Sequence, residues 1–125
     1  GSKYFGTGHI SHWDINGLRD CMTDRKTHFL FLALGNTFKE TPYFRLVKRA
    51  TVMTLIKCFL YKKAIFCVPP GSVYESLHGS GCIHLAISFG TTLYVPHTIK
   101  AQYPTHSNLI PYNDYDELGA FLISK

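Results

Sequence analysis

The sequence predicts an α+β domain, in which N-terminal helices pack on an antiparallel β-sheet. Helix-capping residues precede the apolar segments of the first half, whereas short apolar runs bounded by Pro and Gly fill residues 64–123. The chain has 125 residues, of which 46% are hydrophobic, and this is enough for one domain with its own core. Gly1 and Ser2 look like the remnant of a cleaved tag, so we take residues 3–125 as a single globular domain.

Two helices are expected in the first half of the chain. An apolar run that begins after the N-cap candidate Asp20 and stops at Gly35 predicts a helix over about residues 21–34. The Phe-Leu-Phe-Leu part of this run is equally compatible with a strand. A Thr-Pro pair beginning at Thr41 predicts the start of a second helix, and apolar residues at helical spacing continue it over residues 43–60.

Short strands are expected in the second half, because its apolar runs are brief and are separated by Pro, Gly and other turn residues. The predicted strands are residues 64–68, 73–77, 83–89, 93–95 and 118–123. A turn over residues 78–81 and a Gly-Thr-Thr connection at Gly90 would make the central strands antiparallel neighbours.

The charge balance allows an anionic partner without requiring one. The formal net charge is +5 at pH 7, but charged residues are only 17% of the chain and the basic ones are scattered. The densest group, Arg45, Lys48 and Arg49, has helical spacing and favours a solvated helix face. No apolar run reaches the roughly 20 residues of a membrane helix, so no membrane span is expected.

The four cysteines favour reduced thiols and a cytoplasmic location. They form no C-x-x-C pair, which argues against a zinc site, and a domain of this size does not need a disulfide framework. Cys58 and Cys67 lie in apolar runs and are expected to be buried. His9 and His12 match no metal-binding motif, and the sequence predicts neither a metal nor another cofactor.

Two further histidines flank the expected hairpin. His84 begins the predicted strand 83–89, and His97 follows the predicted strand 93–95. A hairpin brings its two outer ends together, so the imidazoles are expected to be neighbours. This is the arrangement of a catalytic base and the group that orients it.

The motifs Pro70-Gly-Ser-Val-Tyr, His84-Leu-Ala-Ile-Ser-Phe-Gly and Val-Pro-His97 resemble the NlpC-type family of papain-like cysteine peptidases. That family places its nucleophile upstream in an Asp-Cys pair at a helix N-terminus, and Cys21 follows an Asp here. The chain departs from the family pattern at Ser72, where the family has Asp.

The resemblance implies a cysteine hydrolase, a peptidase or amidase acting on a peptide or amide substrate. Its catalytic residues would be Cys21, His84 and His97. A helix N-terminus would lower the pKa of a cysteine thiol, His84 would form the ion pair with the thiolate, and His97 would orient His84.

Three alternatives remain open. The first is a nucleic-acid-binding module, since the chain is basic and several aromatic residues could stack on bases. These aromatic residues are Tyr4, Phe5, Trp13, Tyr61, Tyr94, Tyr103, Tyr112 and Tyr115. The second is a metal-independent ribonuclease with His84 and His97 as acid and base and Lys100 on the phosphate. The third is a protein-interaction domain without catalysis, and the sequence leaves the oligomeric state open.

Overall fold

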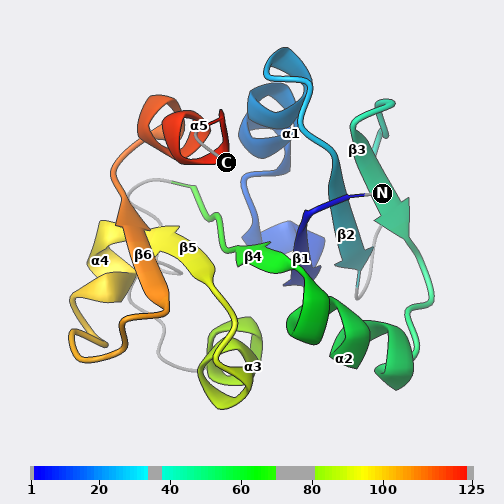
Figure 1. Ribbon diagram of the computed structural model, residues 1–125. Helices are drawn as coiled ribbons and strands as arrows, with labels where there is room; N and C mark the ends of the chain where they lie inside the picture. The colour runs from blue at the N-terminus through cyan, green and yellow to red at the C-terminus, as the bar shows by residue number, and fades with distance from the viewer. Residues whose placement is uncertain (1, 34–37, 70–80, 124–125) are drawn as a thin grey trace.

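The computed structural model describes residues 2–33, 38–69 and 81–123 (Figure 1). Its strands are β1 (Tyr4–Gly8), β2 (Phe29–Ala33), β3 (Phe44–Val47), β4 (Lys63–Ile65), β5 (Leu93–Pro96) and β6 (Leu109–Tyr112). Its helices are the 3₁₀ turn η1 (Ile10–His12), α1 (Ile15–Asp24), α2 (Val52–Tyr61), α3 (Gly81–Phe89), α4 (His97–Lys100) and α5 (Tyr115–Ile123).

The strands form one six-stranded sheet in the order β3-β2-β1-β4-β5-β6, and every pair in it is parallel. The predicted α+β fold with an antiparallel sheet is therefore wrong, and the fold class is α/β. The physical reason lies in burial on both faces. The run at β2, Phe-Leu-Phe-Leu-Ala, is nearly continuous in apolar residues, as is typical of a parallel strand with helices on both sides.

Helices cover both faces of this sheet. The connection from β1 to β2 runs toward the β3 edge, whereas those from β3 to β4 and from β4 to β5 run toward the β6 edge. Right-handed crossovers in opposite directions place their helices on opposite faces. Accordingly α1 contacts α5 on one face and α2 contacts α3 on the other (Figure 1). The chain order of the strands is that of the doubly wound Rossmann-type sheet.

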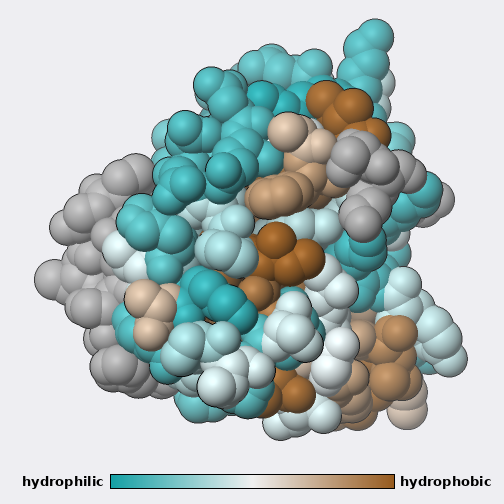
Figure 2. Space-filling model, turned by 60° about the vertical axis from the view of Figure 1, so that its left-hand side comes forward, coloured by the Kyte–Doolittle hydropathy of each residue, from teal (hydrophilic) through white to brown (hydrophobic). Residues whose placement is uncertain are grey.

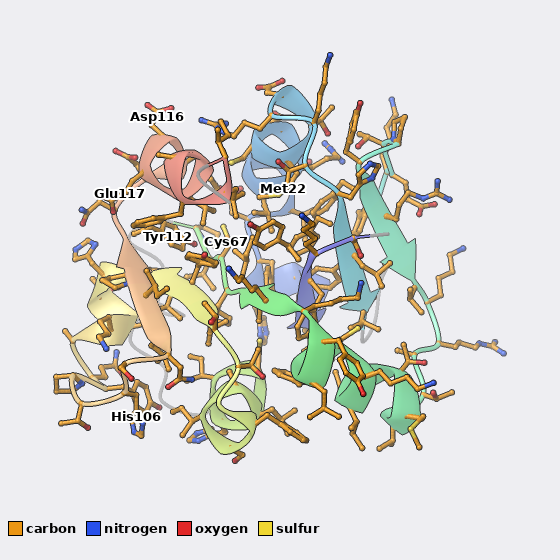
Figure 3. The ribbon with its side chains drawn as sticks, viewed as in Figure 1. Met22, Cys67, His106, Tyr112, Asp116 and Glu117 are labelled. Carbon is orange, nitrogen blue, oxygen red and sulfur yellow. The ribbon has the colours of Figure 1, made fainter. Side chains whose placement is uncertain are left out.

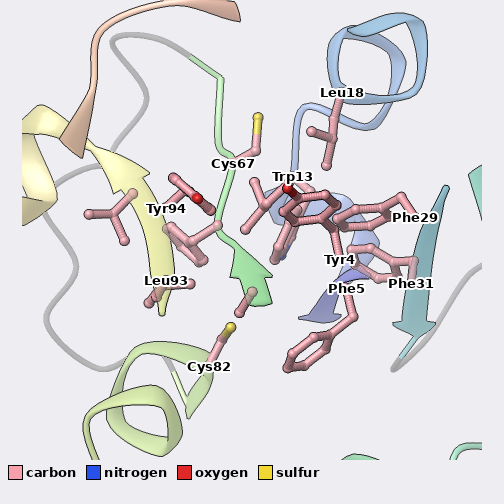
Figure 4. Close-up of a cluster of buried hydrophobic side chains, with 14 of the residues drawn as sticks. Tyr4, Phe5, Trp13, Leu18, Phe29, Phe31, Cys67, Cys82, Leu93 and Tyr94 are labelled. Atoms are coloured by element: carbon pink, nitrogen blue, oxygen red, sulfur yellow. The ribbon is translucent and has the colours of Figure 1, made fainter. Parts of the chain in front are cut away.

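Aromatic rings fill the core around β1 (Figure 4). The Trp13 ring meets Phe31 and Phe66 edge-on, with ring centroids 4.9 and 5.3 Å apart. Phe5, which has no exposed surface, contacts Phe59 of α2 edge-on at 4.9 Å. The core therefore extends through the sheet from the helices of one face to those of the other.

The predicted strand 83–89 is helix α3, and Gly90 is its C-terminal cap. Gly90 has φ +68°, its N–H donates to Ile87 O, and the N–H of Thr91 donates to Ala86 O. These two bonds with a left-handed glycine form the Schellman motif that ends helices. The sequence analysis assigned Gly90 to a hairpin turn, because a glycine with positive φ serves both purposes.

The predicted helix over 43–60 is divided into strand β3 and helix α2. Thr41 Oγ1 accepts hydrogen bonds from the backbone N–H groups of Tyr43 and Phe44, as an N-cap would, but the chain then extends into β3. The true N-cap is Thr51, whose side chain accepts from the Thr54 N–H. Thr hydroxyls make the same local bond in turns and at helix starts, so the bond alone does not predict which follows.

The predicted closing strand 118–123 is helix α5. Asp114 Oδ1 accepts from the Glu117 N–H at 2.8 Å, and Glu117 Oε1 accepts from the Asn113 N–H at 2.8 Å. This reciprocal arrangement is close to a capping box. The predicted helix 21–34 is likewise wrong as one element, because α1 begins earlier, at Ile15, and β2 covers Phe29–Ala33.

The predicted strands 64–68 and 93–95 are confirmed in type by β4 and β5, although β4 ends at Ile65. The predicted strand 73–77 lies outside the described residues, as do residues 78–80 of the predicted turn 78–81, whose last residue, Gly81, begins α3. In the described part of the chain, no helix has the length and apolar character needed to cross a bilayer. On the β6 side of the molecule, hydrophobic side chains reach the surface in small separate groups among hydrophilic ones (Figure 2).

Candidate functional site

The carboxyl edge of the sheet has a topological switch point between β1 and β4. The chain leaves β1 toward β2 on one side and leaves β4 toward β5 on the other. At the end of β1, Gly8 has φ +145°, a conformation that side-chain-bearing residues rarely adopt. His9 follows and is exposed, and its ring lies 5.7 Å from that of the half-buried His12. Two imidazoles therefore lie just beyond β1, beside the switch point.

Trp13 covers β1 next to this pair. A Cβ atom added at Gly6 would lie 2.8 Å from the Trp13 ring, and one at Gly8 would lie 3.1 Å from Trp13 Nε1. The two glycines are thus required by the close approach of the indole to the strand. Thr7, between them, is tied down by its Oγ1, which donates to Leu32 O of β2 at 3.0 Å. The end of β1 is consequently rigid and well packed.

Asp14 and Tyr115 close the N-terminus of α1. Asp14 Oδ1 accepts from the Gly17 N–H at 3.3 Å, which is the helix N-cap bond. The Tyr115 hydroxyl donates to Asp14 Oδ2 at 2.5 Å, so α5 is joined to the start of α1. A carboxylate at this position already uses the positive end of the helix dipole. The first turn of α1 is therefore not open to a second anion.

Cys67 belongs to the same hydrogen-bonded group, just beyond β4 (Figure 3). Its Sγ lies 2.9 Å from the Tyr115 hydroxyl oxygen. Because the single hydroxyl proton of Tyr115 points to Asp14, the Cys67 thiol is the donor in this contact. Burial raises the pKa of Cys67 to about 12 and also raises the pKa of Tyr115. Both groups are neutral at physiological pH, and the cluster is suited to joining α1, β4 and α5 rather than to nucleophilic chemistry.

Cys21, the predicted nucleophile, lies in the second half of α1 and is buried. Its thiol donates to the Tyr115 carbonyl at 3.8 Å, and its Sγ accepts from Arg25 Nη1 at 3.6 Å. Burial raises the pKa of Cys21, and the nearby Arg25 lowers it by less. The predicted position at a helix N-terminus is wrong, because α1 begins six residues earlier at Ile15. Burial outweighs the effect of Arg25, so this setting disfavours the thiolate on balance.

The structure does not bring Cys21 to His84. His84 is an exposed residue of α3, and its ring meets that of Tyr103 edge-on at 6.4 Å. Since α1 and α3 lie on opposite faces, the sheet separates the thiol from this imidazole (Figure 1). His97 is exposed and begins α4, directly after β5. The expected hairpin joining His84 to His97 does not exist, because α3 and the parallel strand β5 take its place.

Most of the aromatic residues considered for base stacking belong to the core. The buried ones are Tyr4, Phe5, Trp13, Tyr94 and Tyr112. Tyr103 and Tyr115 are half-buried, whereas Tyr61 is 82% exposed. Lys100 of the ribonuclease hypothesis donates to the carbonyl of His106 at 2.6 Å, so its ammonium is engaged by backbone.

The residues that shape the switch point were not predicted as a site. Gly6, Gly8 and Trp13 lie in a Gly- and His-rich segment, and Trp13 was considered only for base stacking. The signal available was a Gly-x-Gly pair directly after two aromatic residues, which is compatible with a strand that ends in a close backbone approach. Tyr115 carried no signal, because its partners are 48 and 101 positions away in the chain.

The cysteines and the candidate metal ligands are the remaining reactive side chains. All four cysteines are free and buried, which confirms the expectation for Cys58 and Cys67. Among the described residues, no group of three or more His, Cys, Asp or Glu side chains is placed to hold a metal ion. Comparisons with models of known protein families, with curated protein sequences and with solved structures found no match for this chain.

Proposed function

We propose that this chain binds a phosphorylated small molecule of the nucleotide class at the carboxyl edge of its sheet, between β1 and β4. The observation that carries the proposal is the strand order β3-β2-β1-β4-β5-β6 with all strands parallel. In open α/β sheets, ligands bind outside the carboxyl ends of the strands, at the point where the connections change direction. That point is the β1–β4 junction here.

The groups around the junction suit an anionic ligand. His9 and His12 supply ring N–H donors within one short segment, and His9 is exposed to solvent. The net charge of +5 adds a long-range attraction for phosphate. A ligand at this edge would meet a preorganised backbone, because Trp13 and Thr7 hold the end of β1 in place.

The binding mode proposed here differs from that of the dinucleotide fingerprint. In that fingerprint a Gly-rich turn places a pyrophosphate on the first helix N-terminus. In this chain Asp14 caps that N-terminus and would repel a phosphate placed on it. We therefore assign the phosphate to the side of His9 and His12, and a single nucleotide to the site rather than a dinucleotide.

Thermal unfolding and calorimetric titration with ADP, GDP, UDP, CDP and NAD test this function. At a ligand concentration of one hundred times Kd, binding should stabilise the protein by about 2.7 kcal/mol. We expect at least one nucleoside diphosphate to bind more tightly than NAD. Absence of any nucleotide-dependent change in melting temperature or heat would refute the proposal.

A pair of histidine variants locates the site. The double variant His9→Ala/His12→Ala should lose nucleotide binding while keeping the melting temperature of the free protein. The matched control is His28→Ala, because His28 precedes β2 at the opposite edge of the sheet, where its ring lies 4.9 Å from that of Tyr43. Binding that survives the double variant, or that is lost equally in the control, would contradict the assigned position.

A further inference from the structure

Helix α2 presents an apolar surface to solvent. Val52 is 74% exposed, Met53 60%, Leu60 55% and Tyr61 82%. Cys58 and Phe59 of the same helix are buried, and Phe59 packs on Phe5 of β1. A surface helix usually places polar residues on its outer face, and α2 departs from this pattern.

Most of these exposed residues share one side of the helix. At 3.6 residues per turn, positions 52, 53, 56 and 60 project within about 100° of arc, and positions 57 and 61 lie roughly 40° and 80° beyond its Met53 edge. Ile56, within the arc, is half-buried, and the charged Lys57, beside it, is exposed. Figure 1 shows α2 at the periphery, with the sheet on its inner side. The outer face of α2 therefore carries an apolar strip, defined by Val52, Met53, Ile56 and Leu60, with Lys57 and Tyr61 along one edge.

Basic residues accompany this apolar strip. The sequence has no Asp or Glu between Glu40 and Glu75, and the same interval holds six basic residues. They are Arg45, Lys48, Arg49, Lys57, Lys62 and Lys63. Glu40 is already engaged by Arg45, at 3.2 Å. Lys48 and Arg49, just before the helix, and Lys57, beside the strip, are exposed. Within this interval of the chain, the charged residues that accompany the strip are therefore all basic.

The positive charge near the strip indicates which kind of partner the strip binds. A second copy of the chain related by a two-fold axis would bring Lys57 and its flanking basic residues against their own copies, which costs electrostatic energy. A planar anionic surface meets the convex face of a helix without needing a matching groove. Apolar residues can enter its interfacial layer while Lys and Arg contact its phosphates.

We propose that α2 is a peripheral membrane-binding element that lies in the headgroup region of an anionic bilayer. Met53 and Leu60 enter the acyl boundary, and Tyr61 lies at the level of the headgroups, where amphipathic rings accumulate. Lys57 extends from the strip toward lipid phosphate. This inference is independent of the nucleotide proposal, because α2 and the His9–His12 pair are different parts of the molecule.

Vesicle sedimentation tests the proposal. The wild-type chain should bind vesicles of phosphatidylcholine mixed with phosphatidylglycerol, and bind pure phosphatidylcholine vesicles at least tenfold more weakly. Each basic residue near the surface adds on the order of fivefold to the affinity, so binding should also fall steeply with salt. Failure to bind the anionic vesicles, or binding that ignores both salt and lipid charge, would overturn the proposal.

Three variants separate the strip from nonspecific attraction. Met53→Glu/Leu60→Glu should lower the affinity for anionic vesicles more than tenfold, and Lys48→Glu/Arg49→Glu should lower it by a similar factor. The control Ile123→Glu alters a residue of α5 that is 68% exposed, and it should leave binding unchanged. Circular dichroism confirms that each variant is folded.

Two outcomes would overturn the assignment to α2. One is an equal loss of vesicle binding in Ile123→Glu. The other is an acidic protein partner or a dimer that requires α2 while the vesicles remain unbound, as measured by sedimentation and by size-exclusion chromatography.

Discussion

The two faces of the sheet are closed in different ways. On the face of α1 and α5, side-chain hydrogen bonds from Tyr115 join both helices to the segment after β4. On the face of α2 and α3, ring contacts join the helices to each other and to the sheet: Phe59 stacks on Phe89 at 5.8 Å and meets Phe5 at 4.9 Å. The polar face is joined by the hydrogen bonds of Tyr115, whereas the apolar face continues outward into the exposed strip of α2. The difference shows that a helix can be well packed inside and still lack a partner outside.

The largest expected effect is on thiol reactivity. It tests whether the buried sides of the two faces are equally inaccessible to a thiol reagent. Burial raises the pKa of Cys67, beside α5, and of Cys82, in α3, to about 12 in each case. Their thiolate fractions at pH 8 should be about 1000-fold lower than those of ordinary thiols with a pKa of 9.0. Iodoacetamide should therefore label both cysteines far more slowly in the native protein than in guanidinium.

Cys21 provides the decisive case in this labelling experiment. Burial raises the pKa of its thiol, so native Cys21 should also react more slowly than in the unfolded chain. Mass spectrometry of the labelled peptides measures the four cysteines separately. Preferential labelling of Cys21 in the native protein would contradict the prediction that its thiol is unreactive.

A large effect on stability is expected from Phe59→Ala, which removes a ring from the apolar face. Phe59 is 2% exposed, and truncation of a buried Phe costs about 3–5 kcal/mol. Phe89→Ala is the matched control, because Phe89 is its stacking partner but is 39% exposed. Urea unfolding measures both. Equal losses for the two variants would show that the outer ring contributes as much to the packing of this face as the inner one, which would contradict the prediction.

A smaller effect on stability is expected from Tyr115→Phe, which removes the hydroxyl that joins α5 to the start of α1 on the polar face. Asp14 Oδ2 and the Cys67 thiol would lose their shared partner, at a cost of about 1–3 kcal/mol in the free energy of unfolding. Tyr61→Phe, on the exposed side of α2, should change stability by less than about 0.5 kcal/mol. If both variants were neutral, the hydrogen bonds of Tyr115 would not be what holds α5 to α1.

Some elements of the fold could be predicted from the sequence, and others could not. The burial of Cys58 and Cys67 followed from their apolar runs, and strands at β4 and β5 from short Val-, Ile- and Tyr-containing segments. The strand predicted over residues 83–89 was wrong, because the apolar residues there fit both a two-residue and a helical repeat. In α3 the buried residues are Cys82, Ile83 and Ala86, a helical spacing that becomes decisive only once the position of the sheet is known.

The candidate site was predicted least well. The proposed triad rested on a hairpin between His84 and His97, and the parallel sheet replaces that hairpin by a helix and a strand. His9 and His12 were not predicted to form a site, because their position at a switch point depends on which strands flank β1. A single sequence carries no direct record of strand neighbours.

By itself, the sequence determined which residues avoid water and where local caps form. Composition, apolar runs and side chains such as Thr41, Gly90 and Asp114 act over a few residues, and they did so as expected from their chemistry. Only the tertiary structure decided whether a helix or a strand follows each cap, and which strands pair. Tyr4 of β1 lies beside Lys63 of β4 and Phe29 of β2, and such distant pairings, with helices on both faces, make the sheet parallel. The reason is that local hydrogen bonds are compatible with several continuations, and burial of apolar area against distant segments selects one of them.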